Sequence, residues 1–239
     1  MPDLHYISFA SSSEGNAGLL SYGATHILLD AGISARRITG CLGELGLSAA
    51  SLSAILLTHD HSDHIKGLPV LCRKLSVPIL WPGPTFHSKD PFTIGDVKIT
   101  AFGTPHDAQP SCGFRFEAGE ETLGFATDLG YVTREIYESL RGVRRLVIES
   151  NYDPDMLRDG PYPQSLKARI ASRQGHLSNP DCAELLSHLA GEGLRQVALA
   201  HLSPHNNTPE LAYNAAAQGL SGSECSLCVL DRKEMTRFC

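Results

Sequence analysis

The chain of 239 residues is 42% hydrophobic and 19% charged, which is typical of a folded globular protein and unlike a disordered chain. Its 20 basic and 26 acidic residues give a net charge of −6, so the surface as a whole is not built to attract polyanions. No apolar run approaches the ~20 residues of a membrane span, and the N-terminus lacks the basic region and apolar core of a secretory signal. We therefore expect one domain over residues 1–239, located in the cytoplasm and without a membrane segment.

Hydrophobic patterning predicts strands and helices that alternate along the chain. Strands are expected at residues 4–10, 18–22, 25–30, 53–57, 77–81, 97–102, 113–116, 122–127, 145–149, 196–201 and 226–230. Helices are expected from Ser34, as the N-cap, to Gly46, and at residues 68–75, 133–140, 165–172, 180–189 and 210–220. A serine- and glycine-rich loop is expected before residue 18.

The strongest chemical signal is the run His59-x-His61-x-Asp63-His64, directly after the apolar residues 53–57. In an extended segment, residues two apart point the same way, so His59 and His61 can share one metal ion. A turn beyond them can present Asp63 and His64 to a second ion nearby. Imidazole and carboxylate groups suit Zn²⁺, Mn²⁺ or Fe. Four potential ligands within six residues predict a metal site rather than a polar surface turn.

This loop is similar to the HxHxDH signature of the metallo-β-lactamase-fold hydrolase superfamily. Further motifs follow in the superfamily's order, at residues 104–107, 127–130 and 200–203. The resemblance implies an α/β fold, a four-layer αββα sandwich. It also implies one ion held by His59, His61 and His106. A second ion would be held by Asp63, His64 and His201, with Asp128 between the two ions. Asp30, which ends an early strand, is expected to hydrogen-bond the metal loop.

A finer resemblance is to the YycJ/WalJ-like branch of the superfamily, also called VicX. It is carried by residues 11–16, 128–132, 149–153, 160–163, 175–179 and 206–213. Members of this branch are regarded as single-domain phosphodiesterases that degrade DNA from 5′ to 3′. The chain departs from the branch in its opening loop, residues 11–15, which is more often a glycine–serine mixture. Glu14 in that loop argues against a phosphate cradle there.

Two ions ~3.5–4 Å apart can share a water molecule and stabilise charge on a phosphoryl group. We expect Asp63 and Asp128 to serve catalysis as ligands of such a pair, with a metal-bridging hydroxide as the nucleophile. His176 is the candidate either to donate a proton to the leaving group or to hydrogen-bond the pentacoordinate phosphate, because related phosphodiesterases of this fold place a non-ligand histidine in a comparable loop. The alternative for His176 is a helix-entry residue beside a Ser178 or Asn179 cap. Glu149 either orients His176 or is a surface acid at a strand end.

The substrate is less constrained than the chemistry. Residues 131–173 hold eight basic and six acidic residues, a net charge of +2 in an otherwise acidic chain. Three interspersed tyrosines, at positions 131, 152 and 162, can stack on bases, although such enrichment is equally common on a solvated helix face. Five further histidines lack partners at useful spacing and are expected to be structural or exposed: His5, His26, His87, His188 and His205.

The leading hypothesis is therefore a dinuclear phosphodiesterase with two divalent ions, Zn²⁺ or Mn²⁺, acting as a 5′-to-3′ exonuclease on DNA. The first alternative is a thioester or lactone hydrolase similar to glyoxalase II, which can use the same ligands. A true β-lactamase is disfavoured, because those enzymes typically lack an aspartate between the metals. A non-catalytic, metal-stabilised module is disfavoured because every expected ligand position is filled. The metal, the oligomeric state and the pathway stay open.

Overall fold

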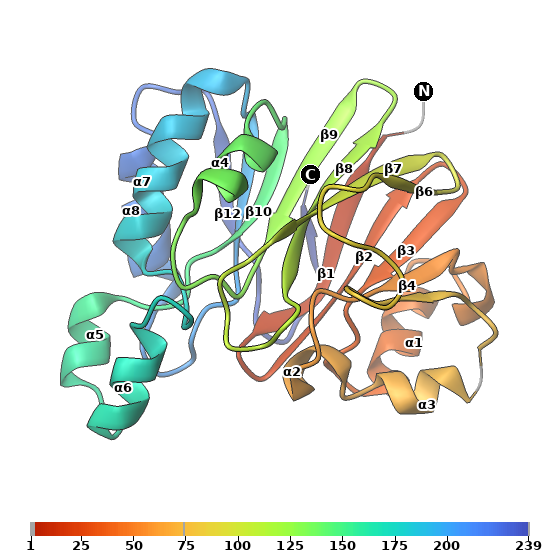
Figure 1. The fold of residues 1–239 in the computed structure, drawn as a ribbon, viewed down its shortest axis with the longest axis horizontal. Coiled ribbons are helices and arrows are strands. Elements are labelled where there is room, and N and C mark those ends of the chain that lie inside the picture. Colours follow the sequence, from red (N-terminus) through yellow and green to blue (C-terminus); the bar gives the residue numbers. More distant parts are fainter. Residues whose placement is uncertain (1–2, 74, 239) are drawn as a thin grey trace.

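The computed structural model describes residues 3–73 and 75–238, which form two mixed β-sheets packed face to face (Figure 1). The first sheet has the spatial order β13 (Thr236–Phe238), β1 (His5–Ser12), β2 (Gly15–Tyr22), β3 (Thr25–Leu29), β4 (Ala54–Leu56) and β5 (Ile79–Leu80). The second has the order β12 (Ser226–Val229), β11 (Gln196–Ala200), β10 (Arg145–Glu149), β9 (Glu121–Ala126), β8 (Cys112–Ala118), β7 (Val97–Gly103) and β6 (Phe92–Ile94).

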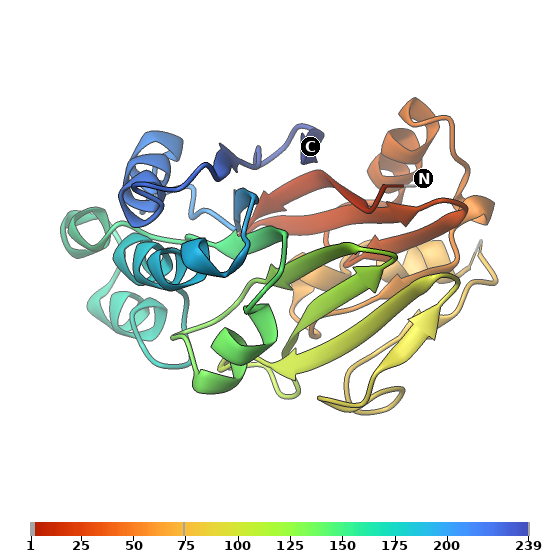
Figure 2. The same ribbon diagram turned by 90° about the horizontal axis from the view of Figure 1, so that it is seen from above.

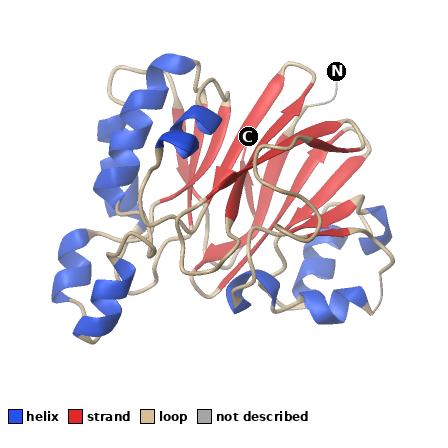
Figure 3. Ribbon diagram, viewed as in Figure 1, coloured by secondary structure: helices blue, strands red, loops and turns tan. Residues whose placement is uncertain are grey.

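Helices cover the outer face of each sheet. The first sheet is covered by α1 (Ala35–Glu44) and α3 (Leu68–Cys72), and the second by α4 (Arg134–Leu140), α7 (Asn179–Leu189) and α8 (Pro209–Gly219). Seen from above, the orange helices of the first group and the green-to-blue helices of the second lie on opposite sides (Figure 2), and the strands lie between them (Figure 3). This order of layers is the αββα sandwich that the resemblance implied, and the fold prediction is confirmed.

The remaining helices are short and lie near the strand ends. They are α2 (Ser62–Ile65), α5 (Pro154–Asp159) and α6 (Gln164–Ile170), with 3₁₀ turns at Ala49–Ser51 and Ala190–Glu192. In Figure 1, α5 and α6 form an arm that stands away from both sheets. None of the helices in the described part of the chain has the length and apolar character needed to cross a membrane.

The apolar strands are buried on both faces, as the alternation of their side chains requires. In β10, Val147 packs into the core between the sheets, whereas Leu146 and Ile148 pack under the helices of the second sheet. All three side chains are fully buried. Each contributes about 1.5–3 kcal/mol of hydrophobic stabilisation relative to an exposed position. These central strands are therefore rigid supports for the loops that leave them.

Most predicted elements are present with ends shifted by one or a few residues, and Ser34 caps α1 as expected, accepting a hydrogen bond from Arg37 N. Two predictions were wrong. The loop expected before residue 18 is a hairpin in which β1 and β2 pair up to Ser12 and Gly15, leaving only a two-residue turn. The strand expected at 77–81 is only Ile79–Leu80, paired to the short β4.

Four elements were not predicted, namely α2, α5, β6 and β13. The two helices span four and six residues, and the two strands three each, so none is long enough to show a hydrophobic period. The helix expected at 68–75 ends at Cys72, and residue 74 of that range lies outside the described residues.

Candidate metal centre

The candidate ligands all follow the carboxyl ends of strands. In the first sheet β3 and β4 are parallel, and in the second β9, β10 and β11 are parallel, with β7 in the same direction because β8 pairs antiparallel with both β7 and β9. Loops that leave strands of one direction emerge at one edge of a sheet, the usual place for a site in αβ folds. This explains how residues from positions 59 to 201 meet.

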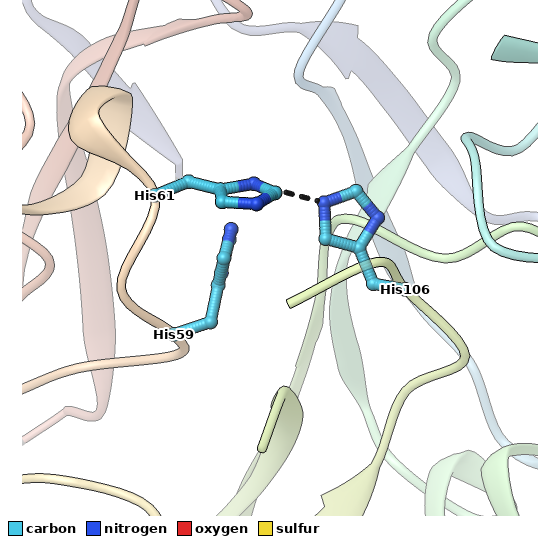
Figure 4. A group of neighbouring side chains, drawn as sticks. All are labelled: His59, His61 and His106. Atoms are coloured by element: carbon cyan, nitrogen blue, oxygen red, sulfur yellow. Dashed lines mark hydrogen bonds between the residues drawn. The ribbon is translucent and has the colours of Figure 1, made fainter. Parts of the chain in front are cut away.

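Three histidines form the first group of possible ligands. His59 and His61 come from the loop after β4, and His106 from the loop after β7. His61 Nδ1 lies 3.2 Å from His106 Nε2, and one ring nitrogen of each histidine lies within 4.8 Å of the others. Figure 4 shows the three rings turned toward one small space. The structure thus brings together the residues that the sequence assigned to one ion.

His59 fits a metal ligand on grounds other than its motif. Its side chain is fully buried, and its Nε2 has no hydrogen-bond partner among the described residues. Burial, helped by the nearby His64, lowers the pKa of His59 to about 2, and burial also lowers the pKa of His106. Both rings are therefore neutral at pH 7 and offer a lone pair. An unpartnered nitrogen at the centre of a histidine cluster is a position that a metal ion would satisfy.

The second group joins α2 to the end of β11. Asp63 Oδ2 lies 3.4 Å from His64 Nε2 and 3.5 Å from His201 Nε2. Asp128, which follows β9, lies between the two groups. Its Oδ2 is 3.2 Å from His64 Nε2, and its Oδ1 is 3.6 Å from both His106 Nε2 and His201 Nε2. The Asp128 carboxylate thus lies close to histidines of both groups, as a bridging ligand must.

The buried carboxylates remain anionic. Burial works to raise the pKa of Asp128, but the charges of His201 and His64 outweigh it and hold that pKa well below its usual range. Burial opposes ionisation of Asp63 as well, and hydrogen bonds from His201 and His64 lower its pKa. Burial alone would lower the pKa of His201. The carboxylates of Asp128, Asp63 and Glu149 outweigh burial and raise that pKa to about 10. Protons on histidines thus balance the acids, and divalent cations would replace those protons.

Hydrogen bonds orient the ligand rings. Asp30 Oδ2 lies 2.8 Å from His64 Nδ1, as expected for an acid that supports the metal loop. Glu149 Oε1 lies 2.8 Å from His201 Nδ1, and the Gly175 carbonyl oxygen 3.0 Å from His106 Nδ1. Each bond occupies Nδ1 and leaves Nε2 directed at the cluster. Such contacts fix the tautomer and the direction of a metal-binding histidine.

Three of these residues adopt a left-handed backbone conformation. Asp30, Asp128 and His201 have φ values of 58°, 59° and 58°, and each lies one or two residues beyond the end of a strand. This conformation costs a non-glycine residue roughly 1–3 kcal/mol. The packing of the two sheets compensates for that cost. All three side chains contact other members of the cluster.

Gly32 lies where the loop after β3 passes the metal loop. A Cβ at this position would lie 1.5 Å from the carbonyl oxygen of Asp63. We expect Gly32→Ala to displace the loop at 59–64, lowering the bound-metal content and destabilising the fold by about 1–3 kcal/mol. Elemental analysis and thermal unfolding of the purified protein measure both effects.

Gly40→Ala is the matched control, because an added Cβ on this helical glycine meets nothing within 4 Å. It is expected to keep the metal and to stabilise the fold by roughly 0.5–1 kcal/mol. Full metal content and an unchanged melting temperature in Gly32→Ala would contradict the tight contact.

His176 and Glu149 belong to the same cluster. Glu149 is fully buried, so the surface-acid alternative was wrong. Its Oε1 lies 2.9 Å from His176 Nδ1, and its Oε2 accepts hydrogen bonds from the backbone N–H groups of Leu129 and Leu177. Ser178 is the N-cap of α7, one of the two caps considered for this helix. His176 lies two residues before the cap, and its Nδ1 is 3.7 Å from Asp128 Oδ1.

Two acids at the centre were not among the predicted site residues. Glu149 is the last residue of β10, which lies between β9 and β11, the strands that precede Asp128 and His201. This strand order is the signal that would have identified Glu149. Asp107 directly follows His106, and its Oδ1 lies 3.4 Å from His106 Nε2 and 3.5 Å from His61 Nε2. Its Oδ2 accepts hydrogen bonds from Arg169. Partial burial works to raise the pKa of Asp107, but these hydrogen bonds outweigh it and lower that pKa.

A pocket of about 320 Å³ opens beside the cluster, where His106 and His176 line it. Of the eight basic side chains in residues 131–173, Arg169 lines this pocket. Others in that segment pair with acids elsewhere, as Arg158 does with Asp155 and Asp159. The net charge of this segment therefore does not form one basic surface at the centre. His205 is exposed, as expected, and also lines the pocket.

Comparisons of sequence identify the relatives of this chain. A model described as the metallo-beta-lactamase superfamily matches residues 13–97, and one described as a beta-lactamase superfamily domain matches residues 84–202. The chain is 36% identical over 235 residues to "Exodeoxyribonuclease YycJ" of Bacillus anthracis, covering 91% of this chain and 89% of that protein. It is 34% identical over 239 residues to "Exodeoxyribonuclease WalJ" of Streptococcus pneumoniae, covering 92% of this chain and 89% of that protein.

Solved structures show the same fold at lower sequence identity. The metallo-beta-lactamase fold protein YhfI of Bacillus subtilis matches with a TM-score of 0.75 and 17% identity, covering 98% of this chain and 100% of that one. Zn²⁺-bound PqqB of Methylobacterium extorquens matches with a TM-score of 0.70 and 16% identity, covering 98% and 99%. From the sequence identity to YycJ and WalJ, the chain belongs to the metallo-β-lactamase superfamily of hydrolases, in the branch of these two proteins.

Proposed function

We propose that this protein is a dinuclear phosphodiesterase that degrades DNA as a 5′-to-3′ exonuclease, with residues 1–239 acting as one domain. The observation that carries the proposal is the position of Asp128 within 3.6 Å of histidines from both ligand groups. An acid–histidine pair, the buried Glu149 and the half-buried His176, lies against this carboxylate. The names of YycJ and WalJ support DNA as the substrate.

The residues that would hold the ions are the seven predicted ligands: His59, His61, Asp63, His64, His106, Asp128 and His201. When bound there, two divalent ions, Zn²⁺ or Mn²⁺, would activate a water molecule for attack and neutralise charge on the phosphoryl oxygens. The donor set of imidazoles and carboxylates suits both metals.

The remaining chemistry falls to the protein's own groups. Glu149 accepts a hydrogen bond from His176 Nδ1, which fixes the ring and leaves Nε2 for the substrate. A protonated Nε2 there donates to the 3′ oxygen as it leaves the phosphorus. General-acid catalysis of this kind contributes typically about 10²–10⁴-fold. The four bonds that Glu149 accepts hold the pair in place before substrate arrives.

The test incubates metal-loaded protein with 5′-phosphorylated DNA, with RNA of the same sequence and with S-lactoylglutathione. We expect hydrolysis of DNA, with a 5′ label released as a mononucleotide before a 3′ label is lost. The chelated protein is the control and is expected to be inactive. Hydrolysis of the thioester alone would instead support the glyoxalase-II-like alternative, and early loss of the 3′ label would contradict the proposed direction.

A further inference from the structure

The pocket beside the metal cluster, called here the α6 pocket, is small. It is lined on the arm side by Tyr162, Leu166, Arg169 and Ile170, and on the sheet side by Asn151 and Ser203. Its volume of about 320 Å³ is at the lower end of the range for small-molecule sites. A pocket of this size accommodates one nucleotide rather than a base pair or a folded nucleic acid.

One wall of the α6 pocket is apolar and aromatic. Tyr162 is half-buried and meets the ring of His205 at a centroid distance of 5.7 Å and an angle of 66°. Leu166 and Ile170, one turn apart on α6, continue the wall. Aromatic side chains stack on any base, since every base has a π-face. This wall therefore matches a single unstacked base.

A cation stands between this wall and the metal cluster. The guanidinium of Arg169 donates to Asp107 Oδ2 from Nε at 2.7 Å and from Nη2 at 2.6 Å. Asp107 in turn lies against His106 and His61, so the ion pair fixes Arg169 next to the candidate ligands. The Arg169 side chain is 62% exposed, so its remaining N–H groups are open to a ligand.

The charges in the α6 pocket also set the orientation of a ligand. Glu14 also lines the pocket and is exposed, and its carboxylate disfavours a phosphate beside it. Arg169 presents a planar set of donors that suits phosphate oxygens. An anionic group is therefore expected at Arg169.

We propose that the α6 pocket binds the terminal nucleotide of the DNA strand, unstacked from its neighbour, with its base on Tyr162 and its 5′-phosphate on Arg169. This inference rests on the proposed function. Water adds to the next phosphorus, the bond to the 3′ oxygen of the terminal nucleotide breaks, and that oxygen takes a proton. The pocket then holds a nucleoside 5′-monophosphate, and the strand is shortened by one nucleotide per turnover.

The test measures binding of the reaction product, so that no turnover occurs. Isothermal titration calorimetry of the metal-loaded protein compares thymidine 5′-monophosphate, deoxyribose 5-phosphate and thymidine. We expect the base-free sugar phosphate to bind roughly tenfold more weakly than the nucleotide, in line with one stacked base. Thymidine is also expected to bind roughly tenfold more weakly, since it lacks the charged group for Arg169.

Two variants assign these differences to residues. Tyr162→Ala is expected to erase the difference between nucleotide and sugar phosphate, and Arg169→Gln the difference between nucleotide and thymidine. Tyr213→Ala, at an exposed tyrosine of α8, is the first control. Arg158→Gln is the second, because Arg158 is 65% exposed and also bonded to carboxylates but lines no part of the pocket. Both controls are expected to bind as the unaltered protein does.

Equal affinity of the unaltered protein for thymidine 5′-monophosphate and deoxyribose 5-phosphate would overturn the proposal without any substitution. Unchanged ligand preferences in Tyr162→Ala and Arg169→Gln would overturn it as well. DNA hydrolysis separates the two proposals: a protein that degrades DNA but shows no preference for the nucleotide refutes the α6 pocket alone. A protein that hydrolyses no DNA refutes the proposed function.

Discussion

Asp128→Ala is expected to lower DNA hydrolysis by at least about 10³-fold while leaving DNA binding largely intact. This carboxylate lies close to histidines of both candidate ligand groups, so its loss would remove the shared ligand of the proposed ion pair. Stabilisation by paired metal ions is worth several kcal/mol, and each 1.36 kcal/mol is tenfold in rate. The rate constant for a labelled DNA and the affinity for the same DNA under non-hydrolysing conditions measure the two effects.

Asp128→Asn separates chemistry from backbone strain. Asp128 has φ of 59°, a conformation that asparagine tolerates better than alanine does. We expect Asp128→Asn to be as inactive as Asp128→Ala but to melt at a higher temperature. Asp60→Ala is the matched control, since Asp60 is an exposed acid in the same loop as the ligands. Normal nuclease activity in either Asp128 variant would refute the bridging role.

His176→Ala is expected to lower kcat by roughly 10²–10⁴-fold without loss of bound metal. His176 Nδ1 lies 2.9 Å from the buried carboxylate of Glu149, which orients the ring. Because His176 is not among the predicted ligands, its loss is expected to leave the metal bound. The loss is expected to be smaller for bis(p-nitrophenyl) phosphate, whose leaving group departs without a proton. Metal analysis and kcat on both substrates measure these effects.

His188→Ala serves as the control for His176→Ala, because His188 is an exposed histidine of α7 that contacts Tyr137 away from the cluster. It is expected to keep full activity. Loss of one metal equivalent from His176→Ala would make His176 a ligand. An equal loss of kcat on both substrates would remove the proton-donor role.

The local pattern indicated the four candidate ligands of the His59–His64 run, which lie within six residues after a buried strand. The resemblance to the superfamily supplied the other three candidates, and each of them follows a strand. The structure brings these residues together because strands of one direction present their carboxyl ends at one edge of a sheet. The layers of the fold followed from the resemblance rather than from the hydrophobic pattern.

Long-range pairing explains what the sequence did not predict. Asp107 accepts a hydrogen bond from Arg169, which lies 62 positions later in the chain. Glu149 ends β10, which the sheet order places between β9 and β11. Ser11, Ser12 and Asn16 of the β1–β2 hairpin are buried and paired across it, although serine and asparagine do not favour strands. This pairing brings Asn16 to the candidate metal centre, where its Nδ2 lies 3.3 Å from Asp63 Oδ2 and 3.1 Å from His64 Nε2.

The spread of the ligands over both sheets has a consequence for the nascent chain. When synthesis has passed residue 126, the nascent chain contains the His59–His64 run and His106, but neither Asp128 nor His201. Within residues 3–73 and 75–238, strand β11, which precedes His201, pairs with β10 and β12, and both come from the last two-fifths of the chain. The seven candidate ligands are therefore brought together only at a late stage of synthesis, and unfinished polypeptides lack the complete site for the proposed ion pair.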